Sequence, residues 1–261
     1  MAASESGRCG PVRWQRLLRV TLPIMLVAAA ACPCPPLLVP EVAAGAAPEL
    51  DVARAACTDA LGVLAAARPG RLVVVGPVGG AGVGHHPAGT TGSFRGFGVG
   101  LDVRLGEGEG EDAEARLPYS LAVGAWLLER TGWSDAPVEG FGVGESSTTE
   151  QCLRSGRELA ARDERVALLV MGDASACRTL KAPGYLDERA APFDAQVARA
   201  LGAADLAALT TLDAGLAHEL KVSGRAPWQV LAGAAEGADL GGSLLYEDAP
   251  YGVGYVVAAW S

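Results

Sequence analysis

The sequence predicts an α/β fold: a three-layer α/β/α sandwich around a mostly parallel or mixed β-sheet. The first observation is that short aliphatic, β-branched runs alternate along the chain with longer segments of helical periodicity. The second is that these runs are apolar throughout, which is typical of strands buried on both faces. The third is the composition of the 261 residues: half are hydrophobic but only 5% are aromatic, which favours a core of Ala, Val and Leu.

Strands are expected where an apolar run is short and bounded by Gly or Pro. The first is MLVAAAA, from Met25 to Ala31, and the clearest central strand is VALLVMG, from Val166 to Gly172. The other predicted strands cover residues 71–76, 98–105 and 138–143 and two pieces within 243–260. In an open α/β sheet, ligands bind beyond the carboxyl ends of the strands, so chemistry is expected in the loops after residues 31, 76 and 172.

Helices are expected where apolar residues follow a helical period and the flanking residues can cap the ends. The segment from Ser147 to Arg162 has Ser and Thr at its start, and Pro227 suits the first turn of a last helix. The other predicted helices cover residues 48–67, 117–131, 193–209 and 213–222.

The N-terminal residues admit two interpretations. A basic run, RWQRLLRV, precedes an apolar stretch, as in a secretory signal peptide. Pro23 interrupts that stretch, and a strand, a Pro-rich loop and a helix follow, which favours a domain that begins at Met25. We therefore expect residues 1–24 to be a disordered or spurious extension, and residues 25–261 to form one cytoplasmic α/β domain. The alternative is export, with residues 1–31 as the signal.

Composition argues against two classes of partner. The net charge of −9 and the pI near 4.9 argue against nucleic acid, because phosphate binding needs a basic face. No apolar run reaches the roughly 18–20 residues of a spanning helix, so no insertion into a membrane is expected. None of these patterns predicts the oligomeric state.

Two of the six cysteines, Cys32 and Cys34, lie at the end of the first strand in the sequence Cys-Pro-Cys-Pro-Pro. A disulfide framework is not expected, because such frameworks are typical of shorter secreted chains. A structural zinc site is not expected either, because it needs a second closely spaced pair of cysteines and the sequence has none. The prolines stiffen the loop, so a Cys34 thiolate is a candidate ligand for a soft metal. A small buried cysteine is the alternative.

A glycine-rich loop follows the strand that ends at Gly76, and it carries His85 and His86. Its sequence, VVVGPVGGAGVG, is similar to a dinucleotide-binding loop, which requires a helix to start at the glycines. Pro87 and further glycines prevent such a helix, so a mobile loop is the better interpretation. The histidines are then solvent-exposed or, if one turns inward, a metal ligand.

The loop after the central strand contains Ser175 in the sequence Gly-Asp-Ala-Ser-Ala. This approaches the nucleophile elbow G-x-S-x-G, but the serine is one residue late and the second glycine is missing. Ser175 with His218 and an aspartate would make a serine hydrolase; otherwise Ser175 hydrogen-bonds within its loop. His218 lies beside Glu219 on a predicted helix, where a surface or capping role is the alternative to catalysis.

Five long segments carry a resemblance to a known family. They are MLVAAAACPCPPLLVPEV, GSFRGFGVGLDV, MGDASACRTLKAPGYLDERAAPFDAQV, GRAPWQVLAGAA and APYGVGYVVAAW. Together they resemble the class III extradiol ring-cleavage dioxygenases, specifically the actinobacterial branch of the B-type subunit family, over nearly all of residues 25–261. The resemblance implies an α/β fold and a non-haem Fe(II) site of two histidines and one glutamate, open to O₂ and a small catechol-type aromatic. A further histidine would act as acid and base.

Other residues occupy the metal positions that the resemblance implies. Cys34 stands where the first histidine is expected, and Pro77 where the second is expected. His85 and His86 come several residues later, and Glu219 is the nearest candidate for the glutamate. A metal site would have to be assembled from Cys34, His85 or His86, and Glu219.

The acid/base histidine is also absent, because Ala176 and Cys177 stand near its expected place.

Two main hypotheses follow. The chain is either an Fe(II)-dependent ring-cleaving dioxygenase with a rearranged site, or a non-catalytic relative that binds a small molecule or a protein partner. A serine hydrolase built on Ser175 is the minor alternative.

Overall fold

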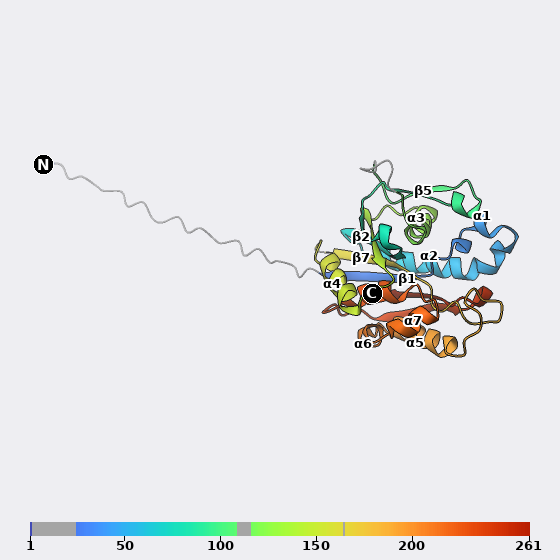
Figure 1. The fold of residues 1–261 in the computed structure, drawn as a ribbon. Coiled ribbons are helices and arrows are strands. Elements are labelled where there is room, and N and C mark those ends of the chain that lie inside the picture. Colours follow the sequence, from blue (N-terminus) through green and yellow to red (C-terminus); the bar gives the residue numbers. More distant parts are fainter. Residues whose placement is uncertain (2–24, 109–115, 164) are drawn as a thin grey trace.

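The computed structural model describes residues 1, 25–108, 116–163 and 165–261, and its centre is a seven-stranded sheet (Figure 1). The strands are β1 (Met25–Cys32), β2 (Arg71–Val78), β3 (Gly84–His86), β6 (Val138–Gly144), β7 (Arg165–Met171), β8 (Gly242–Asp248) and β9 (Tyr255–Trp260). They lie in the order β3-β6-β2-β7-β1-β9-β8. A separate hairpin consists of β4 (Thr91–Ser93) and β5 (Asp102–Arg104).

The sheet is mixed but mostly parallel, as predicted. Strands β6, β2, β7 and β1 run in one direction, β3 is antiparallel at one edge, and β9 and β8 add antiparallel pairings at the other. Ala30 of β1 pairs with Leu169 of β7 on one side and with Ala259 of β9 on the other. The strand predicted at residues 25–31 therefore lies well inside the sheet.

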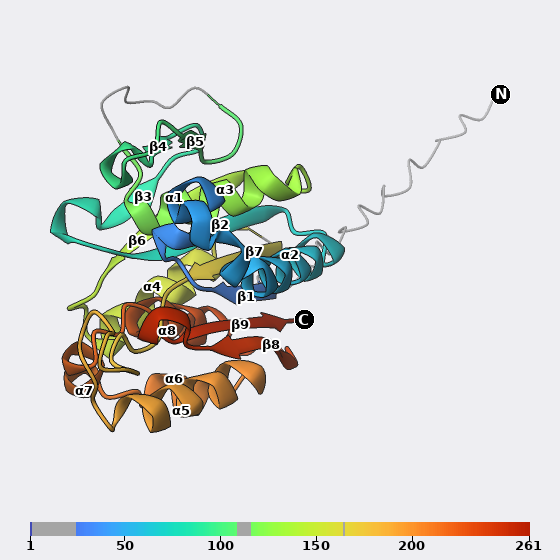
Figure 2. The same ribbon diagram turned by 90° about the vertical axis from the view of Figure 1, so that its right-hand side faces the viewer.

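Helices cover both faces of the sheet, which confirms the three-layer sandwich (Figure 2). The longer helices are α2 (Asp51–Ala66), α3 (Tyr119–Thr131), α4 (Thr149–Ala160), α5 (Ala190–Gly202) and α8 (Arg225–Ala234). The short helices are α1 (Pro40–Ala43), α6 (Leu206–Thr210) and α7 (Ala214–Glu219). Helices α2 and α3 pack on one face, and α4, α5 and α8 on the other. Alternate alanines of β1 face the two cores, so helices on both sides approach it closely.

Helix ends follow local capping chemistry, and one predicted boundary is wrong. Thr148 caps α4: its hydroxyl accepts a hydrogen bond from the Gln151 N–H, and the Gln151 side chain accepts one from the Thr148 N–H. The single helix predicted at residues 193–209 is two helices, α5 and α6. The chain turns between them at Ala204, whose φ is 51°, and the Asp205 side chain then caps α6.

Helices α4 and α8 touch backbone to backbone. A Cβ at Gly156 of α4 would lie 2.0 Å from the Val230 carbonyl oxygen of α8. In the opposite direction, a Cβ at Gly233 of α8 would lie 2.2 Å from the Leu153 carbonyl oxygen of α4. Only glycine at these two positions leaves room for such a close contact between the two helices.

The strand interpretation of the first apolar segment is confirmed, because β1 lies inside the sheet. The prediction that residues 1–24 form a disordered or spurious extension falls on residues 2–24, which lie outside the described residues. Within the part of the chain that the structure describes, no helix is both long and apolar enough to cross a membrane.

The substitution Gly156→Ala is expected to lower the free energy of unfolding by roughly 1–3 kcal/mol, because the new methyl group forces α4 and α8 apart. Gly62→Ala is the matched control: Gly62 is exposed on α2, and no atom lies within 4 Å of its ideal Cβ. The control is expected to be neutral or to stabilise the protein by up to about 1 kcal/mol. Urea denaturation measures both variants, and equal effects would contradict the close contact.

Candidate functional site

The carboxyl edge of the sheet brings together side chains from distant parts of the sequence. Cys34 follows β1, Asp173 follows β7 and Glu145 follows β6. Because β9 is antiparallel to β1, its first residue, Tyr255, lies at the same edge. Tyr119, the first residue of α3, lies close enough to interact electrostatically with Cys34 and Asp173. Two of the loops in which chemistry was expected, those after residues 31 and 172, therefore meet here.

A pocket of about 700 Å³ opens at this edge, a volume within the usual range for small-molecule sites. Its apolar walls include Pro36, Phe97 and Val253. Its polar lining residues include Tyr119, Glu145, Asp173, His218, Lys221 and Ser223. Flat apolar walls with a few polar groups suit a small ring that carries polar substituents.

A second cavity, of about 750 Å³, is lined by Arg104, Trp133 and Val138 among others. Val138 is the first residue of β6, so this cavity lies at the amino edge of the parallel strands. Sheets of this type bind ligands at the opposite edge. We therefore take the pocket at the carboxyl edge as the candidate site.

Asp173 organises the floor of that pocket. Its Oδ1 accepts a hydrogen bond from the Cys34 N–H at 2.9 Å, and its own N–H donates to Ser223 Oγ at 2.9 Å. Its carbonyl oxygen accepts a hydrogen bond from the Gly224 N–H, also at 2.9 Å. Its Oδ2 accepts a long hydrogen bond from the Cys34 thiol, with a sulfur-to-oxygen distance of 4.0 Å, and the described residues offer it no nitrogen or oxygen donor.

The start of α8 lies directly against the backbone of Asp173 because two glycines meet there. A Cβ at Gly172 would lie 2.4 Å from the Gly224 Cα, so any larger residue would push the helix away. The contact allows Ser223 and Gly224 to bond to the backbone of Asp173. Strand β7 and helix α8 are thus joined at the pocket floor.

Electrostatics at the floor favour protonated groups. Burial raises the pKa of Asp173 to about 7, although the hydrogen bond from the Cys34 N–H lowers it. Burial, and then the charge of Asp173, raise the pKa of the Cys34 thiol. Burial also raises the pKa of Tyr119 and of Tyr255, and the charges of Cys34 and Asp173 add to this effect. Near pH 7, Asp173 is divided between acid and carboxylate, while the thiol and both phenols keep their protons.

Basic side chains lie at the mouth of the pocket rather than on its floor. His218 and Lys221 are exposed and line the opening. Arg225 is buried and already bonded: its guanidinium donates to the Ser147 carbonyl at 2.7 Å and to Gln229 Oε1 at 3.0 Å. Of these three, Lys221 and His218 are the groups in position to meet a ligand that enters.

The two histidines of the glycine-rich loop lie on strand β3 rather than on a mobile loop. His85 Nε2 lies 3.1 Å from Glu139 Oε2, and His86 Nε2 lies 2.9 Å from the Gly82 carbonyl oxygen. Strand β3 is four positions from β1 in the sheet. Since neighbouring strands are about 4.8 Å apart, the histidines lie roughly 19 Å from the strand that leads to Cys34.

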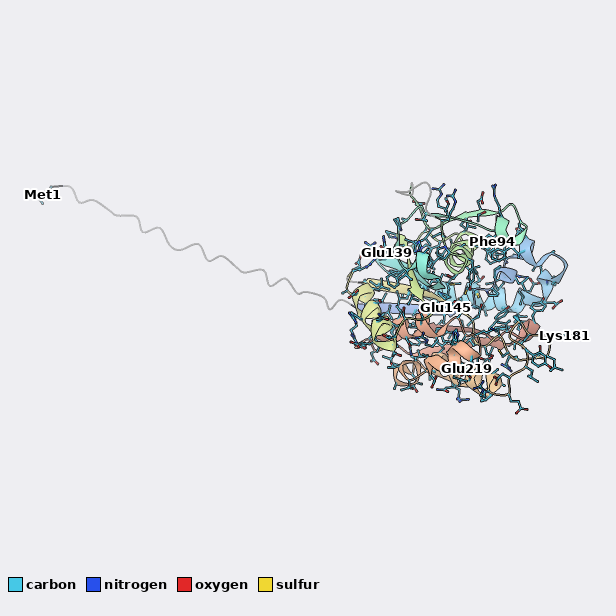
Figure 3. The ribbon with its side chains drawn as sticks, viewed as in Figure 1. Met1, Phe94, Glu139, Glu145, Lys181 and Glu219 are labelled. Carbon is cyan, nitrogen blue, oxygen red and sulfur yellow. The ribbon has the colours of Figure 1, made fainter. Side chains whose placement is uncertain are left out.

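Glu219 is also held elsewhere. It is exposed at the end of α7, and its carboxylate forms an ion pair with Arg189 at 2.7 Å. Figure 3 shows Glu219 well separated from Glu139, the partner of His85, which lies on strand β6 of the sheet. The structure therefore does not bring together the predicted metal ligands, which are Cys34, His85, His86 and Glu219.

The residues at the carboxyl edge do not fit the Fe(II) site that the resemblance implies. That site needs two imidazoles and a carboxylate on one ion. Over residues 25–108, 116–163 and 165–261, no group of three His, Cys, Asp or Glu is placed to hold a metal ion. Near the expected acid/base position, Ala176 lines the pocket, and the buried Cys177 directs its thiol to the Leu220 carbonyl at 3.5 Å.

Ser175 has a structural role, which corrects its prediction as a catalytic candidate. It is fully buried, and its hydroxyl donates to Asp194 Oδ2 at 2.8 Å while its N–H donates to Oδ1 at 2.8 Å. Asp194 also forms an ion pair with Arg178 at 3.0 Å. His218 lies at the pocket mouth on α7, so the described residues do not form a Ser175–His218 pair.

Sequence reasoning missed Asp173, Tyr119 and Tyr255. Asp173 is the second residue of the Gly-Asp-Ala-Ser-Ala sequence, directly after the strand whose loop was expected to carry chemistry. A carboxylate at a strand end was therefore the available signal. The two tyrosines begin a helix and an antiparallel strand, and no local pattern relates them to residue 173.

Comparison with known proteins bears on the fold alone. No family model and no curated protein matches the sequence. A crystal structure of the uncharacterized protein JW3007 from Escherichia coli K12 is similar, with a TM-score of 0.50 and 14% sequence identity. The similarity covers 90% of this chain and 99% of that one. It supports the α/β fold along almost the whole chain.

The titration of Asp173 is expected to make the protein less stable as the pH rises. Its pKa is near 3.9 in an unfolded chain and about 7 in the folded protein, so the folded form binds the extra proton between these values. The free energy of unfolding should therefore fall between about pH 4 and pH 7, by on the order of 4 kcal/mol. Asp173→Asn should remove this fall. Urea denaturation at acidic and alkaline pH measures it.

The matched control is Asp59→Asn, which removes an exposed carboxylate from α2. This variant should retain the fall in stability that the wild type shows. Parallel pH curves for the wild type and Asp173→Asn would mean that Asp173 titrates as an ordinary surface carboxylate.

Proposed function

We propose that the protein binds a small aromatic molecule with an oxygen substituent, such as a phenol, in the pocket at the carboxyl edge of its sheet. In this proposal it is a relative of the class III extradiol dioxygenases that does not hold their Fe(II). The observation that carries the proposal is the carboxylate of Asp173 in a pocket with apolar walls: among the described residues, its Oδ2 accepts only a long hydrogen bond, at 4.0 Å, from the Cys34 thiol.

The pocket offers matched surfaces for both parts of such a ligand. Pro36, Phe97 and Val253 give apolar walls against which a ring can pack. At the floor, Asp173 Oδ2 accepts a hydrogen bond from a ligand hydroxyl when it is ionised, and it donates one when it is protonated. Tyr255 lines the same pocket, and its buried phenol is a further donor.

The metal-binding side chains of the site favour binding of the aromatic molecule without iron over Fe(II)-dependent ring cleavage. Asp173, Glu145 and His218 are the metal-binding types that line the pocket, and Cys34 lies next to Asp173; burial favours the protonated form of both Asp173 and Cys34. A metal ligand must be deprotonated, so an ion would have to overcome both effects without the help of two imidazoles. Fe(II)-dependent cleavage of a catechol remains the second candidate, because the fold and the position of the pocket are those that the family resemblance implies.

Calorimetric titration of the full chain with catechol tests the binding site. Asp173→Asn should weaken catechol binding about 10- to 100-fold, because it removes a hydrogen bond to a charged or ionisable group. Asp59→Asn should bind catechol as the wild type does. Binding that is absent, or that is equally strong in the wild type and Asp173→Asn, would refute the proposed site.

Iron content distinguishes the two candidates. Protein purified without oxygen is expected to carry no stoichiometric iron and to show no Fe(II) binding at micromolar concentration. The opposite result would be about one iron per chain, lost on Cys34→Ala, together with O₂ uptake when catechol is added. That result would replace the proposal with a rearranged dioxygenase site.

A further inference from the structure

A short loop joins β4 to β5 and carries an aromatic side chain to the pocket. Phe97 stands at the tip of this loop, residues 95–98, which is exposed throughout. Its side chain lines the pocket, yet Phe97 is 45% exposed. The hairpin of β4 and β5 packs on α3 and forms a small sheet of its own (Figure 2). A large apolar side chain that is held half in water beside a pocket gains free energy when it becomes buried.

The loop is fastened at its base but not at its tip. Phe94 is fully buried, and its N–H donates to the Leu101 carbonyl at 2.8 Å, which closes the base. The Phe97 N–H donates to the Phe94 carbonyl at 2.9 Å, and the Gly98 N–H donates to the Arg95 carbonyl at 3.0 Å. In the described part of the chain, the hydrogen bonds of the tip's backbone N–H groups all stay within the hairpin.

Glycines give the tip room to turn. An ideal Cβ at Gly96, Gly98 or Gly100 would meet no atom of the described residues within 4 Å, apart from its chain neighbours. Gly98 has a φ of 83°, a backbone conformation that favours glycine. One ion pair, between Arg95 and Asp102 at 2.9 Å, spans the hairpin, and it adds little because both side chains are largely exposed. A segment with so few contacts moves at a low cost in free energy.

We propose that residues 95–98 form a lid: when an aromatic ring enters the pocket, the tip turns about its base at Phe94 and Leu101, and Phe97 closes over the ring. This inference rests on the proposed function, because the bound ring supplies the surface that Phe97 covers. It adds control of ligand entry and release, which fixed pocket walls do not provide.

The driving force for closure is the burial of Phe97 between two aromatic rings. The centroid of its ring lies 6.4 Å from that of the buried Phe94, with the two planes tilted by 45°. A bound ring gives Phe97 a second aromatic neighbour and removes its exposed surface from water. The closed lid also keeps water away from the hydrogen bonds that the ligand makes at the pocket floor.

Hydrogen–deuterium exchange of the full chain, with and without saturating catechol, tests the closure. In the free protein the amides of Phe97 and Gly98 should exchange rapidly, because their hydrogen bonds lie in one exposed turn. With catechol bound, these amides should exchange at least about 10-fold more slowly. Phe97→Ala should bind catechol about 5- to 10-fold more weakly by calorimetry, and its tip should gain no protection when catechol is bound.

The matched control is Val52→Ala, which truncates another exposed apolar side chain, on α2 and outside the pocket lining. This variant should bind catechol and protect the tip as the wild type does. Catechol binding that leaves the exchange of residues 95–98 unchanged in the wild type would overturn the lid and leave the proposed function in place. Absence of catechol binding to the wild type would overturn the proposed function, and the lid with it. The exchange measurement on the wild type decides the matter even if Phe97→Ala does not fold.

Discussion

The backbone of Asp173 is the point on which the candidate site depends. Its carbonyl oxygen and N–H bond to Gly224 and Ser223, and its carboxylate bonds to the N–H of Cys34. The ends of β1 and β7 and the start of α8 are therefore fixed to one another at a single residue. The glycine contacts make this geometry available: Gly172 admits the start of α8, and Gly156 admits α4 against the rest of that helix. A larger residue at either position would displace the helix and, with it, the pocket floor.

Most of the fold could be predicted because its signals are local. A strand buried on both faces must be apolar along its length, and the runs at residues 25–31 and 166–172 show this without any knowledge of their neighbours. The errors occurred where distant contacts decide the outcome. His85 and His86 follow glycines that suggest a free loop, yet they pair with β6 as a sheet edge. At the break after Gly202, the residue with the positive φ is Ala204 rather than a glycine, and the capping by Asp205 marks the start of the next helix.

The site was only partly predictable, since it is assembled from residues far apart in the sequence. The type of sheet pointed to the loops after residues 31 and 172, which meet at the pocket, and so to Cys34. Within the second loop, the likeness to a nucleophile elbow drew attention to Ser175, whose hydroxyl is committed to Asp194. A single aspartate after a strand, such as Asp173, belongs to no sequence motif that would mark it as functional. Its importance comes from burial and from tyrosines that the fold brings to it, and neither is readable along the chain.

Two carboxylates at opposite edges of the same sheet have opposite surroundings. Burial alone would raise the pKa of Glu139, but Arg162, His85 and Arg71 hold it below its ordinary value. Asp173 has no such cation among the residues that the structure describes, so the folded protein bears the free-energy cost of its charge. If a small molecule binds this pocket as proposed, its hydrogen bond to Asp173 offsets part of that cost. Binding and folding are then thermodynamically linked, and a saturating ligand raises the free energy of unfolding.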